Sequence, residues 1–160
     1  LQDEILTPSA PSLTGDDDRP LAAERRVVAA FKKVALMVLG TAMQTYGEKL
    51  SDEQEVLSFA ADIISDLYAA ESAVLRAGAA GAAAHPQAAL HEAAVRVFVD
   101  GAAQRVEAAA RSALAAMAEG DTLRTLLAAL RRVLKVTPVN TVTLRRELAD
   151  AAAGRGGYIL

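Results

Sequence analysis

The chain has 160 residues, a formal net charge of −3 and a pI near 5.4; 52% of its residues are hydrophobic, 4% are aromatic and none is cysteine. This length suits one domain, and the acidic balance argues against nucleic-acid binding, which needs a basic face. The missing cysteines exclude disulfides, thiol catalysis and thiolate metal sites. We find neither an apolar run of about 18 residues, as a membrane span would need, nor a signal-peptide pattern.

The first 19 residues are predicted to form a linker. Their stretch TPSAPSLTGDDDR is rich in Pro, Ser, Gly and Asp, residue types that disfavour regular structure. Because the chain begins with Leu1 and not Met, we expect it to be a piece of a longer polypeptide. The remaining residues, 20–160, are then expected to form a single domain.

The first helix is predicted over residues 21–46, with one buried face made by apolar residues three and four positions apart. That face holds Val27, Val28, Phe31, Val34, Ala35, Val38, Leu39 and Ala42. Leu36 and Met37 are apolar but lie off this stripe, so we interpret them as a second contact surface. The basic residues Arg25, Arg26, Lys32 and Lys33 lie outside the buried face. We interpret them as a solvated face with pairs to Glu24 of the same helix, the alternative being contact with anionic lipid.

The second helix is predicted from a capping box, with Ser51 as N-cap and Gln54 at N3, to about Ala77. Glu71 falls on its predicted apolar face with Ile64, Leu67, Val74 and Leu75. A carboxylate there could be a catalytic base, a flavin or metal contact, or half of a buried ion pair. We favour the ion pair, because an unpaired buried charge is costly, with Arg96, Arg105 or Arg111 as the partner. Asp62 and Asp66 are predicted to lie opposite this face, in solvent.

Three further helices follow, over about 87–118, 122–135 and 141–153. Asn140 is predicted to cap the last helix and Gly154 to end it. The tail RGGYIL ends in Tyr158, Ile159 and Leu160, which we expect to dock or to contact a partner. Amphipathic helices with short connections and no strand pattern predict an all-α protein. The expected fold is an antiparallel bundle of four main helices plus a short C-terminal helix.

No motif in the chain indicates a catalytic, cofactor or metal site. His85 and His91 lack the HExxH spacing, so we interpret them as surface or capping residues. No serine has the G-x-S-x-G setting of a hydrolase. The stretch GAAGAAA lacks the lysine of a P-loop and is interpreted as a connector.

Several phrases together resemble the C-terminal helical extension of bacterial acyl-CoA dehydrogenases that are similar to the very-long-chain enzyme. The phrases are AFKKVALMVLGTAMQTYGEKLSDEQEVLSFAADIISDLYAAESAVLRA, LLAALRRVLKVTPVNTVTLRRELAD and the ending GRGGYIL. The most specific parts are YGEKLSDEQEVL followed by ADIISDLYAAES, and TPVNTVTLRRELAD. The resemblance covers the chain from about Pro20 to Leu160.

The resemblance implies a parent enzyme that holds FAD and oxidises a fatty acyl-CoA to the trans-2-enoyl-CoA. A glutamate base removes the α proton, a hydride passes to the flavin, and electrons leave to an electron-transfer flavoprotein. In the family, the base and the flavin and acyl-CoA pockets belong to a catalytic core that precedes this region. No residue here matches those positions, so Glu71 is not identified with the family's base. Residues 1–19 would then link the domain to that core.

The sequence therefore predicts an accessory domain that has no flavin or dehydrogenase activity of its own. We expect it to pack on its catalytic core and to support a homo-oligomer, with Leu36, Met37, Tyr158, Ile159 and Leu160 as interface residues. The expected location is the bacterial cytoplasm, with attachment to the inner membrane less favoured. The alternative function is a helical module for membrane surfaces or proteins, without an enzymatic parent.

Overall fold

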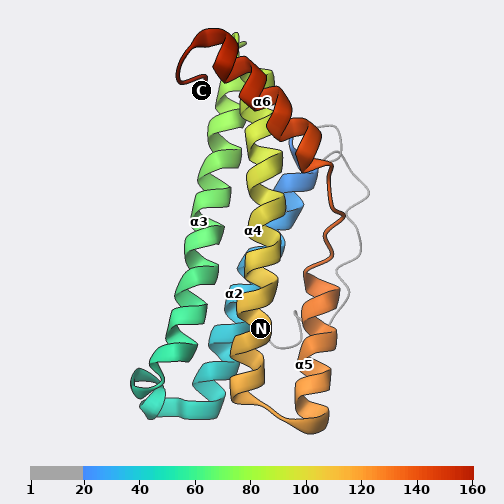
Figure 1. Ribbon diagram of the computed structural model, residues 1–160. Helices are drawn as coiled ribbons and strands as arrows, with labels where there is room; N and C mark the ends of the chain where they lie inside the picture. The colour runs from blue at the N-terminus through green and yellow to red at the C-terminus, as the bar shows by residue number, and fades with distance from the viewer. Residues whose placement is uncertain (1–19) are drawn as a thin grey trace.

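The computed structural model describes residues 20–160 and shows an all-helical protein (Figure 1). Within that range the helices are α2 (Ala22–Tyr46), α3 (Gln54–Ala82), α4 (Ala88–Met117), α5 (Gly120–Val133) and α6 (Thr141–Arg155), with a 3₁₀ helix, η1 (Gly47–Asp52), between α2 and α3. The predicted fold class is thereby confirmed. The linker predicted over residues 1–19 lies outside the described residues.

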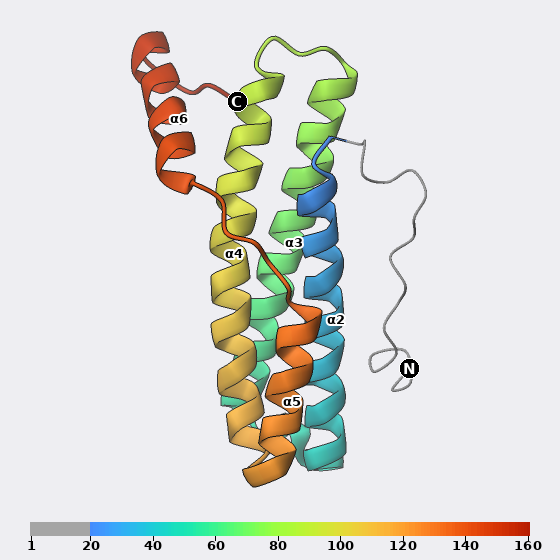
Figure 2. The ribbon, with the colours of Figure 1, turned by 90° about the vertical axis from the view of Figure 1, so that its right-hand side faces the viewer.

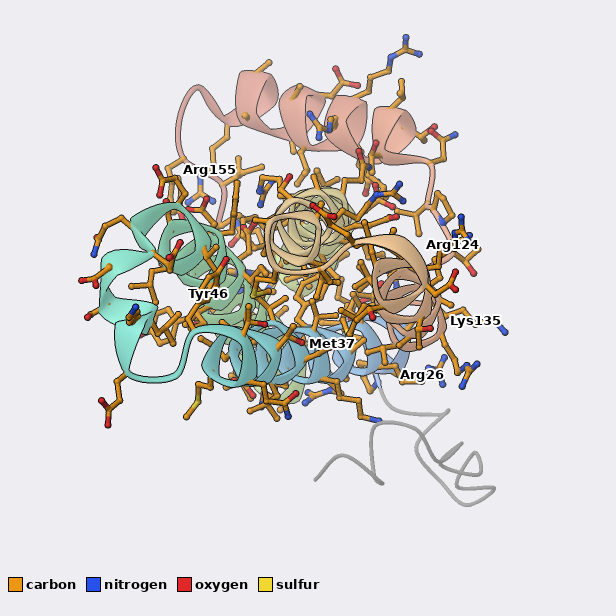
Figure 3. All side chains as sticks on the ribbon, turned by 90° about the horizontal axis from the view of Figure 1, so that it is seen from below. Arg26, Met37, Tyr46, Arg124, Lys135 and Arg155 are labelled. Carbon is orange, nitrogen blue, oxygen red and sulfur yellow. The ribbon has the colours of Figure 1, made fainter. Side chains whose placement is uncertain are left out.

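The four helices α2 to α5 alternate in direction and lie side by side, and α6 crosses one end of the bundle (Figures 1 and 2). Seen along the bundle, α4 occupies the centre, with α2, α3, α5 and α6 around it (Figure 3). The chain returns from α5 to α6 along an extended connection. This arrangement leaves the outer sides of α2 and α3 uncovered by any other described helix.

The core consists mainly of aliphatic side chains, many of them alanines. The largest fully buried side chains are Phe31, Val34, Val38, Ile63, Val106, Leu114 and Leu130. Ala70, Ala102, Ala110 and Ala113 are fully buried between them. Alanine is the strongest helix former and its small side chain allows helices to approach closely.

Two predictions about α3 are wrong. Ser51 is not its N-cap, since it lies in η1 and the N-cap position belongs to Glu53. The side chain of Gln54 instead donates to the carbonyl oxygen of Ser51, at 2.6 Å. The helix also continues past Ala77 to Ala82, because the alanines of this stretch favour helix more than Gly78 and Gly81 disfavour it.

The start of α6 is as predicted, whereas its end is not. The Oδ1 atom of Asn140 accepts a hydrogen bond from the backbone N–H of Thr143, at 3.2 Å, which confirms Asn140 as the cap. The helix passes through Gly154 and ends at Arg155, with Gly156 as its C-cap at a φ of 70°. Glycine adopts this left-handed conformation at little cost, so Gly156 is the better terminator.

Met37 is buried in the core, not exposed beside Leu36 as a second contact surface. The reason is that α5 packs against α2 and covers a second side of it. Leu36 remains exposed, as the interface prediction requires.

The sequence expectation that no segment is long and apolar enough to cross a membrane is wrong for α2 and η1. Taken together as Ala22–Asp52, they meet that criterion by length and composition alone, with a hydropathy of 1.4. In the bundle, however, one face of α2 is buried through Phe31, Val34 and Val38. An apolar helix in the core of a helical bundle can have the same length and hydropathy as a membrane-spanning helix.

Candidate interaction surface

Glu71 forms an ion pair with Lys32 of α2, and its side chain is 42% exposed. The prediction of an ion pair is therefore confirmed, whereas its burial and its predicted partners on α4 are wrong. A half-exposed carboxylate paired with an ammonium lacks the enclosed setting of a general base. Glu71 thus links α2 to α3 at the surface of the bundle.

The error in placing Glu71 comes from the register of α3. The buried face of this helix consists of Val56, Ala60, Ile63, Ala70, Val74 and Ala77. Ile64 and Leu75, which were assigned to that face, are exposed. Three of the six residues on the buried face are alanines. The larger aliphatic residues beside that face therefore led to a predicted apolar face that was rotated toward Glu71.

Asp66 is the more buried carboxylate of α3, contrary to its prediction as a solvated residue. Its side chain is 17% exposed, and Arg105 of α4 donates to both of its oxygens, from Nε at 2.9 Å and from Nη2 at 2.6 Å. The guanidinium also lies 5.7 Å from the ring centre of Phe98. The hydrogen bond to Asp66 raises the pKa of Arg105. This two-point contact fixes α3 against α4.

Glu24, which was predicted to pair within its own helix, pairs instead with Arg96 of α4. Their Oε1 and Nε atoms are 3.7 Å apart, and Glu24 is buried. Arg96 also contacts Glu92, one turn away on α4, at 3.5 Å. Glu24 lies in the first turn of α2, where the helix dipole favours a negative charge. It therefore ties the start of α2 to α4.

Arg25 lies across α3 at Gly78. A Cβ atom added to Gly78 would lie 3.0 Å from Nη2 of Arg25, so the missing side chain makes room for the guanidinium. The Nε atom of Arg25 is shielded from solvent and has no hydrogen-bond partner in the described part of the chain. Such a buried, unsatisfied donor costs about 1–3 kcal/mol. Arg25 is the one polar side chain of residues 20–160 that shows this defect.

Two contacts show how α2 and α3 face each other. Arg25 meets Gly78, and Lys32 meets Glu71. Arg25 and Lys32 are seven residues apart on α2, and Glu71 and Gly78 are seven residues apart on α3. Between these contacts runs a shallow groove of about 270 Å³, which Leu75 also lines. Because residues three, four and seven positions apart share one side of a helix, this register places further residues along the same groove.

These further residues are large and apolar. Leu36 lies one turn beyond Lys32 on α2, and Met43 two turns beyond Leu36. On α3, Tyr68 and Ile64 continue the line of Glu71. We call the set Leu36, Met43, Ile64, Tyr68 and Leu75 the α2–α3 surface; every member is classed as exposed. Leu36 is the one residue of this surface that the sequence analysis predicted at an interface, whereas Ile64 and Leu75 were predicted on the buried face of the helix.

The predicted interface residues of the tail divide between core and solvent. Tyr158 is exposed, Ile159 is buried and Leu160 is half-buried. Ile159 therefore docks the tail on its own bundle. Tyr158 alone of the three keeps a large exposed surface for a partner.

A second, open cleft of about 330 Å³ lies between α2, α4 and the connection from α5 to α6. Valines form much of its lining, and its charged residues are Glu24, Arg26, Arg96, Asp100 and Lys135. Figure 3 shows Arg26 and Lys135 on the same side of the bundle. Asp100 accepts a hydrogen bond from the backbone N–H of Val139, at 3.2 Å, which holds the connection in place. A cleft of this volume is too small for a dinucleotide such as FAD.

The two histidines lie together where α3 turns into α4. Nδ1 of His85 accepts a hydrogen bond from the backbone N–H of Gln87, at 3.2 Å, which agrees with the predicted capping use. His91 is buried, contrary to its prediction as a surface residue, and its ring meets that of His85 edge-on at 5.6 Å. Burial lowers the pKa of His91, and the charges of Arg76 and His85 lower it further. Residues 20–160 contain no group of three or more His, Asp and Glu side chains that could hold a metal ion.

The described residues form a helical domain whose helices are linked by ion pairs. It has an exposed apolar surface, and no reactive group among these residues is enclosed. These features are typical of a domain that packs against other protein. The sequence model described as "Acyl-CoA dehydrogenase, C-terminal domain" matches residues 30–132. The chain therefore belongs to the acyl-CoA dehydrogenase family, as a C-terminal domain.

Two similar proteins agree with this assignment. A probable acyl-CoA dehydrogenase of Bacillus subtilis is 44% identical over 138 residues, which is 84% of this chain and 22% of that protein. A solved acyl-CoA dehydrogenase of Bacillus anthracis, in complex with FAD, superposes with a TM-score of 0.91 and 38% identity. That match covers 99% of this chain and 27% of the solved one. The chain thus spans about a quarter of the length of these relatives.

Proposed function

We propose that this chain is the C-terminal accessory domain of an FAD-dependent acyl-CoA dehydrogenase that acts in fatty acid β-oxidation. The parent enzyme would convert acyl-CoA to trans-2-enoyl-CoA and pass electrons to an electron-transfer flavoprotein. The domain itself has a structural role: it packs on the catalytic core and supports contacts in a homo-oligomer. The observation that supports this most is the match of 99% of the chain to part of a dehydrogenase that was solved with FAD.

The interior of the domain supports a structural role. Its buried charges, Glu24 and the nearly buried Asp66, are each paired with an arginine of α4. Charges neutralised in this way hold helices together and are poor general bases. The open cleft beside Glu24 is too small for a dinucleotide.

The test compares the full-length enzyme with a version that lacks residues 20–160. We expect the full-length protein to be yellow, to reduce its flavin with a fatty acyl-CoA, and to be oligomeric by light scattering. The shortened protein should keep its flavin and lose stability or oligomeric order. A full-length protein without flavin or acyl-CoA oxidation would disprove the proposed parent activity. If the full-length protein holds flavin and the shortened protein does not, this domain contributes to the cofactor site.

A further inference from the structure

We propose that the α2–α3 surface binds the remainder of the parent polypeptide, through an apolar segment that places a carboxylate opposite Arg25. This proposal rests on the proposed function and adds to it the contact surface and the chemistry of the partner segment. Three observations support it: the distribution of exposed apolar side chains, the state of Arg25 and the length of the relatives.

Exposed apolar side chains concentrate on one side of the bundle. Five of the eight large hydrophobic residues exposed in residues 20–160 belong to the α2–α3 surface; the others are Val139, Val142 and Tyr158, near or on α6. The outer face of α5 is different, since Arg124, Arg131 and Arg132 are exposed on it. Exposed apolar side chains gathered on one side of a domain are typical of protein-binding surfaces. Compared with the outer face of α5, the α2–α3 surface is better suited to bind another protein segment.

Arg25 adds a charge requirement to this apolar surface. Its Nε atom is already shielded from solvent but has no acceptor among the described residues. The one carboxylate in the groove, Glu71, is engaged with Lys32. Arg25 as a whole is half-buried, so a carboxylate arriving beside it would pair with its charge through charge-assisted hydrogen bonds, the strongest type available at a protein surface. The partner segment is therefore apolar with an acidic side chain.

The relatives show where such a segment comes from. This chain corresponds to 22% of the Bacillus subtilis protein and 27% of the Bacillus anthracis chain, so most of each relative lies outside the matched segment. The larger part of a parent enzyme is thus tethered to the domain and is present at high effective concentration. A second copy of the domain is the competing occupant, and the experiment separates the two.

The experiment is oxidative footprinting of the full-length enzyme, with the rates of modification of Tyr68 and Met43 compared with that of Tyr158. Tyr68 and Tyr158 are 74% and 72% exposed in the bundle, so they form a matched pair. We expect Tyr68 and Met43 to be modified several-fold more slowly than Tyr158, at all protein concentrations. Modification of Tyr68 as fast as that of a fully exposed tyrosine would overturn the proposal, whatever the rate at Tyr158. Protection that disappears on dilution to the monomer would assign the surface to a second copy, which also overturns it.

Two pairs of variants test the apolar and the charged parts separately. Leu75→Glu should raise the modification of Tyr68 and Met43 toward that of Tyr158, whereas Val142→Glu should not; these residues are 58% and 57% exposed. Arg25→Gln should have a smaller effect in the same direction, with Lys33→Gln as a control of equal charge change on the same helix. Circular dichroism must show unchanged helix content in each variant.

Each outcome of these variants bears on one part of the proposal. Identical footprints for Leu75→Glu and Val142→Glu would contradict the proposed apolar contact. Identical footprints for Arg25→Gln and Lys33→Gln would remove the proposed carboxylate. Flavin content and acyl-CoA oxidation, measured on the same samples, report on the proposed function independently of the footprint. A yellow, active enzyme with an unprotected Tyr68 would overturn this inference and leave the proposed function standing.

Discussion

The two sides of α3 hold it to its neighbours by different means. Toward α4, Asp66 is nearly buried and accepts hydrogen bonds from Arg105 on both of its oxygens. Toward α2, Glu71 is half-exposed and meets the end of a flexible lysine. Both residues are carboxylates on one helix, and each is paired with a cation. The difference shows that the depth of the contact and the shape of the cation, more than the presence of a pair, decide how firmly a helix is held.

The same contrast extends to the apolar residues. On the α4 side, Phe98 packs against the core and lies beneath Arg105. On the α2 side, Ile64, Tyr68 and Leu75 remain exposed next to Glu71. The α3–α4 contact is therefore complete within the domain. Between α2 and α3, the inward-facing side chains are buried, but the apolar residues at the outer edge are exposed. The proposed partner would bind at this outer edge.

The largest expected effect tests which face of α3 belongs to the core. Ile63 is fully buried and its neighbour Ile64 is 44% exposed. Ile63→Ala should lower the free energy of unfolding by about 3 kcal/mol, because it removes buried methylenes and leaves a cavity. Ile64→Ala should cost less than about 1 kcal/mol. Urea denaturation of the two variants measures the difference, and equal losses would contradict the observed register.

This pair also shows how far the sequence could lead. The long helices were predictable, because large apolar residues recur along α2 and α4 and Asn140 gives a clear start for α6. The rotation of α3 was not, since Ala60, Ala70 and Ala77 form much of its buried face. Alanine is common on buried and exposed helix faces alike, so an alanine-rich face gives a weak periodic signal.

The candidate site depended on that rotation. With α3 turned toward Ile64 and Leu75, Glu71 was placed in the core and Asp66 in solvent, the reverse of what the structure shows. The pairing of charges across helices also depends on register between segments far apart in sequence. Glu24 with Arg96, and Arg25 over Gly78, could not be read from local spacing. The off-stripe position of Leu36 and the seven-residue spacing of Arg25 and Lys32 were the available signals for the α2–α3 surface.

The second expected effect concerns the ion pair on the α4 side. Asp66→Asn should lower the free energy of unfolding by about 1 kcal/mol, a value reduced because Arg105 is half-exposed. A double-mutant cycle with Arg105→Gln isolates the coupling between the two side chains. The coupling should weaken only modestly in high salt, because Asp66 is shielded by the bundle. Absence of coupling would mean that the two-point contact contributes nothing in solution.

The third prediction uses the pH dependence of the α3–α4 turn. The folded state lowers the pKa of His91, chiefly through burial, below the ordinary value of 6.5. The unfolded chain therefore binds a proton more readily than the folded one as the pH falls below 6.5. Stability should fall from about pH 7 to about pH 5, before most carboxylates titrate. His91→Gln should flatten this part of the profile, whereas His85→Gln should leave most of it, as measured by denaturant midpoints.

The smallest expected effect belongs to Glu71, the residue first suspected of chemistry. A buried, paired glutamate replaced by leucine would strand its partner and cost about 3–5 kcal/mol. Because Glu71 and Lys32 are both half-exposed, Lys32 can turn to water when its partner is lost. Glu71→Leu should therefore change the free energy of unfolding of the chain by less than about 0.5 kcal/mol. A loss several times larger in urea denaturation would show that this pair holds α2 to α3 as firmly as Asp66 holds α3 to α4.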